Sequence, residues 1–297
     1  MKLGLVCISE ILKKNNNDWR FRTMTRKQFN SLGRSQALRT LSERILTNVK
    51  VMDRIVRHCR ELGIAHYRIS SNLFPLVTDQ TLNIDYKDLP DLGHILAQLC
   101  AIASDNDISF STHPDQFNVL PSLNPDTVQR TVLELNHQAR VMDWMNLPKD
   151  HSAPMCLHLG LSPKAIDEVP DFIERFYQAF EQCDEGVRNR LVLENEDKGY
   201  WNCQNLYDTF GGNFPLVYDN LHDQCNPSDD ANYCDLFAST WGAFNPVFHW
   251  SEGIDGTRKH TAYFSHVPKV VVNNPQITWE CEVKAKDFAI KNVLTPV

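Results

Sequence analysis

The sequence predicts a single-domain (β/α)8 TIM barrel, an α/β fold, over residues 1–297. Three observations support this prediction: short apolar runs recur along the whole chain, helix-favouring stretches separate them, and no linker or change in composition divides the chain. A succession of eight strand–helix units is typical of this barrel. A doubly wound open sheet is the alternative, but no glycine-rich phosphate loop follows the first expected strand.

The expected elements follow one another along the chain. Strands are expected at 3–8, 66–70, 107–112, 155–160, 191–195, 215–220, 246–251 and 281–285. The clearest helices are expected at 37–62, 89–104, 125–145 and 166–183. Asn124 followed by Pro125 is a typical helix start. Asn202 is a candidate cap for a short helix over 204–210.

Composition excludes several classes of protein. With 42% hydrophobic and 23% charged residues, the chain is unlike disordered, fibrous or low-complexity proteins. No run approaches the ~20 apolar residues of a membrane helix, and the apolar start is too short for a signal peptide. We therefore expect a soluble, cytoplasmic protein, nucleoid-associated if bacterial, with no membrane partner. No heptad or apolar stripe demands a second copy, so a monomer is expected.

The cysteines and glycines narrow the chemistry. Nine cysteines are widely spaced without a C-x-x-C pair, which argues against a disulfide framework and against a thiolate zinc site. We interpret most of them, such as Cys156, as small core residues of a protein in a reducing compartment. With 12 glycines the chain contains neither G-x-G-x-x-G nor a P-loop, so no nucleotide cofactor is expected.

Charge is distributed unevenly. Residues 13–39, here called the basic segment, hold eight basic residues and one acid, Asp18, which gives a net charge of +7. The whole chain has −7, so the remainder has −14. A basic segment of this size is the footprint expected of a phosphate-binding surface, although a solvated basic loop is the alternative. The acidic remainder suggests carboxylates whose charge metal ions would offset.

Metal-binding residue types recur at the ends of six expected strands and in one following loop. They are His113, His158, Glu194, Asp219 with His222 one turn later, His249, Glu282, and His260 in the loop after the seventh strand. In a barrel the C-terminal strand ends meet on one face. Imidazole and carboxylate ligands suit divalent metal ions, and seven or eight of them exceed one tetrahedral site. Two or three ions are therefore expected, for phosphoryl hydrolysis or sugar isomerisation.

These residues lie in segments that resemble the UV damage endonucleases, relatives of the metal-dependent abasic-site endonuclease barrels. The resembling segments are 4–9 (GLVCIS), 67–75 (YRISSNLFP), 113–117 (HPDQF), 157–160 (LHLG), 193–196 (LENE) and 219–222 (DNLH). The resemblance implies incision of damaged double-stranded DNA immediately 5′ to UV photoproducts, which leaves a 3′-hydroxyl and a 5′-phosphate. It also implies two or three divalent ions, manganese being typical and magnesium, zinc or cobalt the alternatives.

The resemblance also implies roles for individual residues. The implied metal ligands are His113, His158, Glu194, Asp219, His222, His249, His260 and Glu282, of which Glu194, Asp219, His249 and Glu282 are the catalytic candidates. Gln116 and Phe117 resemble a pair that wedges into the duplex beside the damage. The other DNA-binding candidates are Asn72, Arg20, Arg22, Arg26, Lys284 and Lys286.

The sequence departs from the family pattern at a few positions. Val247 stands where some members have a modified lysine, and no histidine occurs at 72–79, where Asn72 and Asp79 are the nearest substitutes. Leu5 and Phe117 stand where some members have an aromatic residue and a tyrosine. Three alternatives stay open: an abasic-site endonuclease, a metal-dependent sugar isomerase or epimerase, and a lesion-binding protein without nuclease activity.

Overall fold

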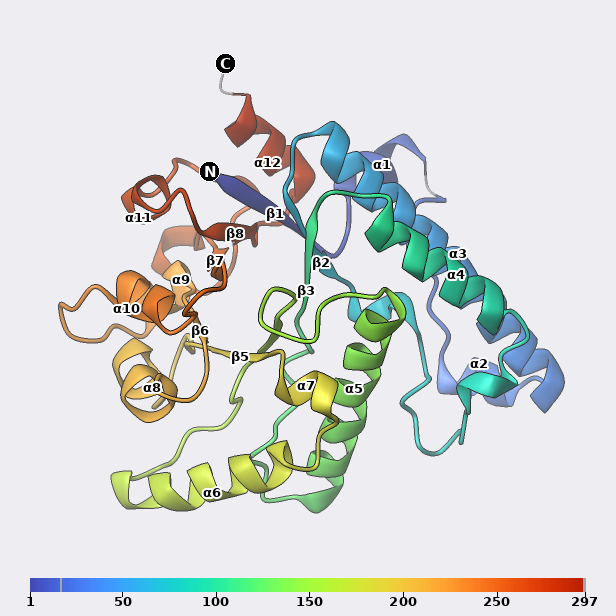
Figure 1. Ribbon diagram of the computed structural model, residues 1–297, viewed down its shortest axis with the longest axis horizontal. Helices are drawn as coiled ribbons and strands as arrows, with labels where there is room; N and C mark the ends of the chain where they lie inside the picture. Colours follow the sequence, from blue (N-terminus) through green and yellow to red (C-terminus); the bar gives the residue numbers. More distant parts are fainter. Residues whose placement is uncertain (17, 296–297) are drawn as a thin grey trace.

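The computed structural model, which describes residues 1–16 and 18–295, contains eight parallel strands in the order β6-β5-β4-β3-β2-β1-β8-β7 (Figure 1). The strands are β1 (Lys2–Val6), β2 (His66–Ile69), β3 (Ser109–Thr112), β4 (Met155–Leu157), β5 (Leu191–Glu194), β6 (Leu216–Val217), β7 (Val247–Trp250) and β8 (Thr278–Cys281). Each pair of sequential strands except β6 and β7 is joined by a parallel ladder. The predicted (β/α)8 barrel is confirmed.

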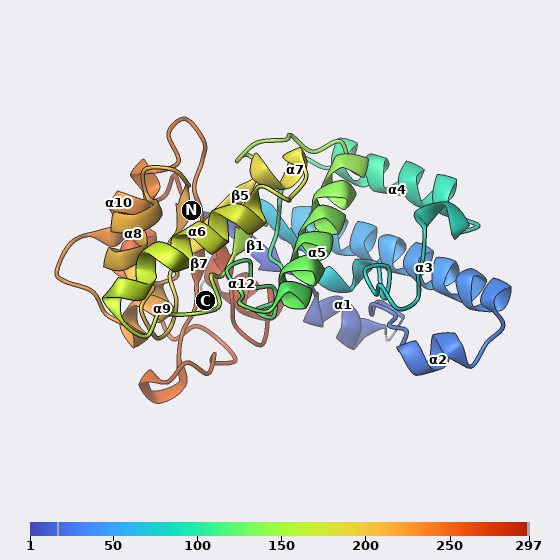
Figure 2. The same ribbon diagram turned by 90° about the horizontal axis from the view of Figure 1, so that it is seen from below.

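Helices surround these strands (Figures 1 and 2). They are α1 (Glu10–Asn15), α2 (Arg26–Asn30), α3 (Arg34–Glu61), α4 (Leu92–Ser104), α5 (Pro125–Trp144), α6 (Val169–Phe180), α7 (Glu185–Arg188), α8 (Cys203–Phe210), α9 (Asn220–Cys225), α10 (Tyr233–Ser239), α11 (Lys269–Asn273) and α12 (Asp287–Leu294). The longest, α3, has 28 residues and packs beside α4. The side chains of Asn124 and Asn202 cap α5 and α8, as the sequence predicts.

Several predicted boundaries differ from the structure. The last strand was expected at 281–285 and instead ends at Cys281, so that prediction was wrong. A charged residue such as Glu280 is typical of a loop when the sequence is considered alone. In the folded barrel this side chain is buried beside cationic partners. The first strand ends at Val6, two residues early, because Cys7 adopts a φ of 64°, outside the strand conformation. The helix expected at 166–183 is a 3-10 turn (Ile166–Glu168) followed by α6.

The seam between β6 and β7 closes the barrel. In the described part of the chain no ladder joins these strands, and a single parallel bridge pairs Asp219 with His249. The backbone N–H of His249 donates to the Tyr218 carbonyl at 3.0 Å. One residue further along the chain, the Asn220 amide donates to the Ser251 carbonyl and accepts from the Ser251 N–H, each at 2.9 Å. Two predicted metal ligands thus form the closing contact.

The core consists of apolar side chains between the strands and the surrounding helices. The cysteines are free, and six of them are buried, which agrees with their interpretation as core residues. Over the described residues, no helix is both long enough and apolar enough to cross a membrane.

Candidate metal centre

Glu194 lies at the centre of the predicted site and contacts four predicted histidine ligands. It is the last residue of β5, and its side chain is 1% exposed. One carboxylate oxygen, Oε2, lies 2.9 Å from Nε2 of His113 and 3.3 Å from Nε2 of His158. The other, Oε1, lies 2.8 Å from Nδ1 of His249 and 3.2 Å from Nδ1 of His222. Four predicted histidine ligands, contributed by different strand ends, therefore converge on the carboxylate of a fifth predicted ligand.

Asp219 and Glu282 complete what we call the strand-end cluster. Its members are His113, His158, Glu194, Asp219, His222, His249 and Glu282. Asp219 caps α9, because its Oδ1 accepts from the backbone N–H groups of Leu221 and His222. Its Oδ2 accepts from the Ser251 hydroxyl at 3.0 Å, so both oxygens are oriented by the fold. Glu282, one residue beyond β8, lies 3.8 Å from Nδ1 of His249.

Neighbouring groups orient two of the imidazole rings. Nδ1 of His113 lies 3.0 Å from the Pro114 carbonyl, which turns Nε2 toward the cluster. Nδ1 of His158 lies 3.5 Å from Glu196, whose carboxylate also accepts from the Gly160 N–H. Contacts of this kind around a metal ligand fix the ring and select the nitrogen that is free to bind.

A second group of polar residues, not foreseen as functional, lies beside the cluster inside the barrel. Arg68 pairs with Glu280 and, at 2.5 Å, with Glu282. His66 Nε2 lies 2.9 Å from Glu280 and 2.9 Å from the Ser111 hydroxyl. A signal was present in the sequence: Arg68 stands between Tyr67 and Ile69 in an expected barrel strand, and an arginine buried there requires an acid, because an unpaired buried charge is costly.

The electrostatics of the cluster follow from burial and charge. Burial alone would raise the pKa of Glu194, but His249, His158 and hydrogen bonds from other histidines hold it well below its usual range. Burial disfavours the charged form of His249 and of His222, yet the neighbouring carboxylates hold both pKa values well above the usual range. In His113 burial prevails and lowers the pKa. The buried carboxylates of the strand-end cluster thus stay ionised because positive charge lies beside them.

Three groups of donor atoms in the described chain are compact enough to hold a metal ion. They are His113 with Cys156, Glu194 and His249; Glu194 with Asp219 and His222; and His249 with Glu280 and Glu282. Within each group the donor atoms lie within 4.8 Å of one another. Imidazole and carboxylate donors fit divalent ions, and metal binding would displace the imidazolium protons, since neutral imidazole is the ligand. The residues present therefore fit the expected ions.

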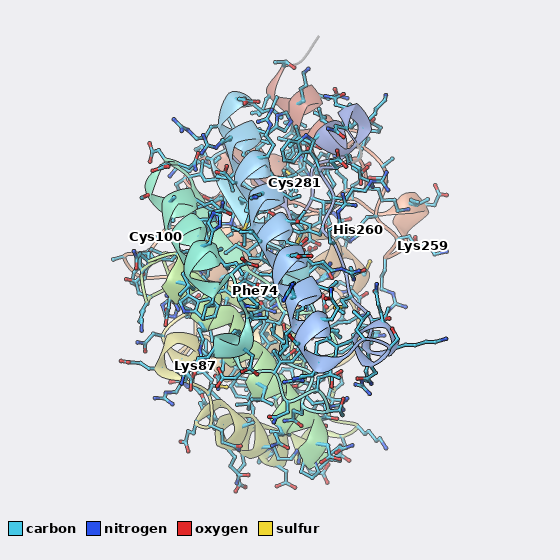
Figure 3. The ribbon with its side chains drawn as sticks, turned by 90° about the vertical axis from the view of Figure 1, so that its right-hand side faces the viewer. Phe74, Lys87, Cys100, Lys259, His260 and Cys281 are labelled. Atoms are coloured by element: carbon cyan, nitrogen blue, oxygen red, sulfur yellow. The ribbon has the colours of Figure 1, made fainter. Side chains whose placement is uncertain are left out.

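Two predicted ligands lie outside these three groups: His158, which still contacts Glu194 at 3.3 Å, and His260. His260 lies in the loop after β7, where an antiparallel bridge pairs it with Gly253. Figure 3 shows it beside Lys259 near an edge of the molecule, separate from Cys281. The adjacent Thr261 carbonyl accepts from the N–H of Lys284, so this loop runs alongside the chain that follows β8.

A groove of about 830 Å³ contains several of the predicted DNA-binding residues. Arg26, Asn72 and Phe117 line it, and Phe117 is 80% exposed. Gln116 is exposed beside Phe117. The groove also includes Asp115, two residues beyond His113, so it begins close to the strand-end cluster.

The remaining basic candidates lie on the surface or near it. Arg20 is exposed, Arg22 lies 3.5 Å from Asp18, and Arg26 lies 2.7 Å from Asp79. After β8, Lys284 is exposed and Lys286 half-buried. Asp79 is thus engaged with an arginine, and Leu5 and Val247 are buried.

Comparison with known proteins decides the family. Residues 1–295 match the model of the family described as UV-endonuclease UvdE. The chain belongs to the UV-endonuclease UvdE family. A relative named UV DNA damage endonuclease, from Nostoc sp., is 30% identical over 304 residues, which cover 98% of this chain and 89% of the relative. The predicted family and the prediction of an endonuclease are confirmed.

Solved structures confirm the barrel of this UvdE-family chain. The crystal structure of SacUVDE matches with a TM-score of 0.78 and 23% identity, over 99% of this chain and 96% of that one. Endonuclease IV from Thermus thermophilus matches with a TM-score of 0.57 and 12% identity, over 98% and 97% of the two chains. At these identities the likeness concerns the fold alone.

Proposed function

We propose that this UvdE-family chain repairs DNA by cutting the phosphodiester backbone immediately 5′ to UV photoproducts in damaged double-stranded DNA. The observation that supports it most is the strand-end cluster, in which the Glu194 carboxylate gathers histidines from four other parts of the barrel. The reaction is a metal-assisted hydrolysis that leaves a 3′-hydroxyl and a 5′-phosphate. The cytoplasmic location and monomeric state stay predictions.

We infer that two divalent ions, manganese first among them, are the cofactors. When bound, they supply Lewis-acid activation of water and stabilise the charge that develops on the phosphate. Glu194 presents one oxygen to each side of the cluster, which makes it the candidate shared ligand. In the third donor group Arg68 already pairs with both carboxylates, Glu280 and Glu282. A third ion would compete with that guanidinium, which favours two ions over three.

The residues around the groove have the chemistry to hold DNA next to these ligands. The exposed Phe117 ring can occupy the stack from which damaged bases are extruded, and the exposed Gln116 amide can bond the partner bases. Arg20, Arg22 and Arg26 supply positive charge for flanking phosphates. Their place after β1, on the face where the strand-end cluster lies, supports this role.

A nicking assay tests the proposal. The substrates are duplexes with one central photoproduct, one abasic site or no damage, each incubated with Mn²⁺ or with EDTA, and the cut is mapped to the nucleotide. We expect a metal-dependent cut directly 5′ to the photoproduct and none in the undamaged duplex. Preference for the abasic duplex would replace the proposal by an abasic-site endonuclease. Binding without cutting would indicate a lesion-binding protein. If the protein neither binds nor cuts the duplexes, sugars become the substrates to test next.

A further inference from the structure

One member of the first donor group is a thiol that the sequence interpretation assigned to the core. Cys156 is on β4, two residues before His158, so both side chains face the same side of the strand. Its side chain is 4% exposed, and Sγ donates to Oε2 of Glu194 at 3.5 Å. Its sulfur therefore belongs to a compact set with nitrogens of His113 and His249.

The donor set of this group differs from that of its neighbours. It offers two imidazole nitrogens, one carboxylate oxygen and one sulfur, whereas the other two groups offer one nitrogen and two carboxylates each. Sulfur is a soft ligand that favours zinc and related ions, while carboxylate-rich sets suit manganese and magnesium. Donor atoms around a tetrahedral zinc ion are roughly 3.3–3.8 Å apart, given bond lengths of about 2.0–2.3 Å. Oε2 of Glu194 lies 2.9 Å from Nε2 of His113 and 3.5 Å from Sγ of Cys156, close to these distances. His249 contacts the other oxygen, Oε1, at 2.8 Å, and the donor atoms of the group all lie within 4.8 Å of one another.

We propose that Cys156 is a metal ligand and makes one position of the centre selective for zinc or cobalt over manganese. The group is nearly enclosed, since Cys156, Glu194 and His249 are buried and only His113 is partly accessible. On coordination the thiol proton leaves to water and the sulfur binds as thiolate. The centre would then hold two different kinds of ion, a soft one at Cys156 and a hard one at Asp219. This inference rests on the proposed metal-dependent function.

Cobalt spectroscopy tests the inference without measuring activity. Metal-free protein is titrated with Co²⁺ in a thiol-free reductant, bound cobalt is counted by dialysis, and the near-ultraviolet spectrum is recorded. We expect a thiolate-to-cobalt charge-transfer band in the wild type. The band should be lost in Cys156→Ser and in Cys156→Ala. It should persist in Cys183→Ser, which changes another buried thiol, one that hydrogen-bonds only within its own helix end.

Metal competition gives the second measurement. Cys156→Ser should weaken zinc binding by about 10-fold or more, the scale typical of perturbed metal sites, and change manganese binding much less. Cobalt bound to the wild type without the band would overturn the inference, as would a band that survives both Cys156 variants. Manganese-dependent nicking by that same wild type would leave the proposed function intact. If the wild type binds no divalent ion at all, both proposals fail.

Discussion

The strand-end cluster and the basic segment both concentrate charge, but the fold treats them differently. In the cluster Glu194 is buried, and four histidines surround its two oxygens. In the basic segment Arg20 is exposed, and Arg22 and Arg26 meet single acids at the surface. A buried charge requires compensation, so folding fixes its geometry. An exposed ion pair contributes about 0–1 kcal/mol, so folding alone fixes little there.

This difference indicates a division of labour. In the proposed function, the chemistry belongs to side chains that folding holds in place before any substrate arrives, as expected of a preorganised site. The same proposal assigns the contacts with DNA phosphates to exposed side chains that the substrate would order. Substitutions in the two regions should therefore change different quantities.

The largest expected effect is in the cluster. Glu194→Gln removes the negative charge that four histidines share, so nicking of the photoproduct duplex should fall about 10³-fold or more, since metal stabilisation is worth several kcal/mol. Single-turnover rates at saturating enzyme measure the loss. Glu181→Gln, an exposed carboxylate after α6, is the matched control and should retain the wild-type rate. A Glu194→Gln enzyme within tenfold of wild type would remove this residue from the mechanism.

A smaller effect is expected at the tip of the groove. Phe117 is 80% exposed, so Phe117→Ala should leave the melting temperature unchanged. Base stacking on an aromatic side chain is worth about 1–3 kcal/mol, which predicts a loss of about 5- to 160-fold in kcat/KM on damaged duplex. Leu123→Ala is the control, since Leu123 is 79% exposed in the segment between Phe117 and α5. Equal losses from the two substitutions would contradict a specific role for the ring.

The smallest effect on rate, and the clearest on salt dependence, is expected in the basic segment. Alanine at Arg20, Arg22 and Arg26 together should weaken DNA binding at low salt and flatten the plot of log affinity against log salt by about one unit per lost phosphate contact. Fluorescence anisotropy across salt concentrations measures this slope.

A triple alanine variant at other surface ion pairs tests whether position matters. Arg54, Arg57 and Lys149 each pair with an acid outside the basic segment. Their replacement should leave the slope nearly unchanged. If both triple variants flatten the plot equally, the basic segment is not a dedicated DNA contact.

The sequence predicted the barrel and most of the cluster for one physical reason. Parallel strands alternate with helices, so residues at strand ends necessarily meet on one face, and their chemical types can be listed without coordinates. It did not predict which side chains would touch. Arg68 and Glu280 were overlooked because their pairing joins residues more than 200 positions apart. Cys156 was assigned to the core on its apolar neighbours, although alternation directs it toward Glu194.

Local conformation explains two further differences between the expected and the observed positions. Cys7, at the end of β1, has a positive φ that its apolar neighbours do not reveal. His260 has the right residue type, but its position depends on a long loop whose path no periodicity specifies. Long loops of this kind are where sequence patterns contain least structural information.

The position of two metal ligands at the seam between β6 and β7 links metal binding to the stability of the fold. Asp219 and His249 form the bridge that closes the barrel there, and both belong to donor groups for metal. A cation that binds this face therefore binds the closed barrel more tightly than an opened one, and by mass action raises the free energy of unfolding. Amide protons at the seam should exchange more slowly as metal is added. A chelator would then act as a mild denaturant as well as an inhibitor, and cells short of the metal would lose the protein together with its activity.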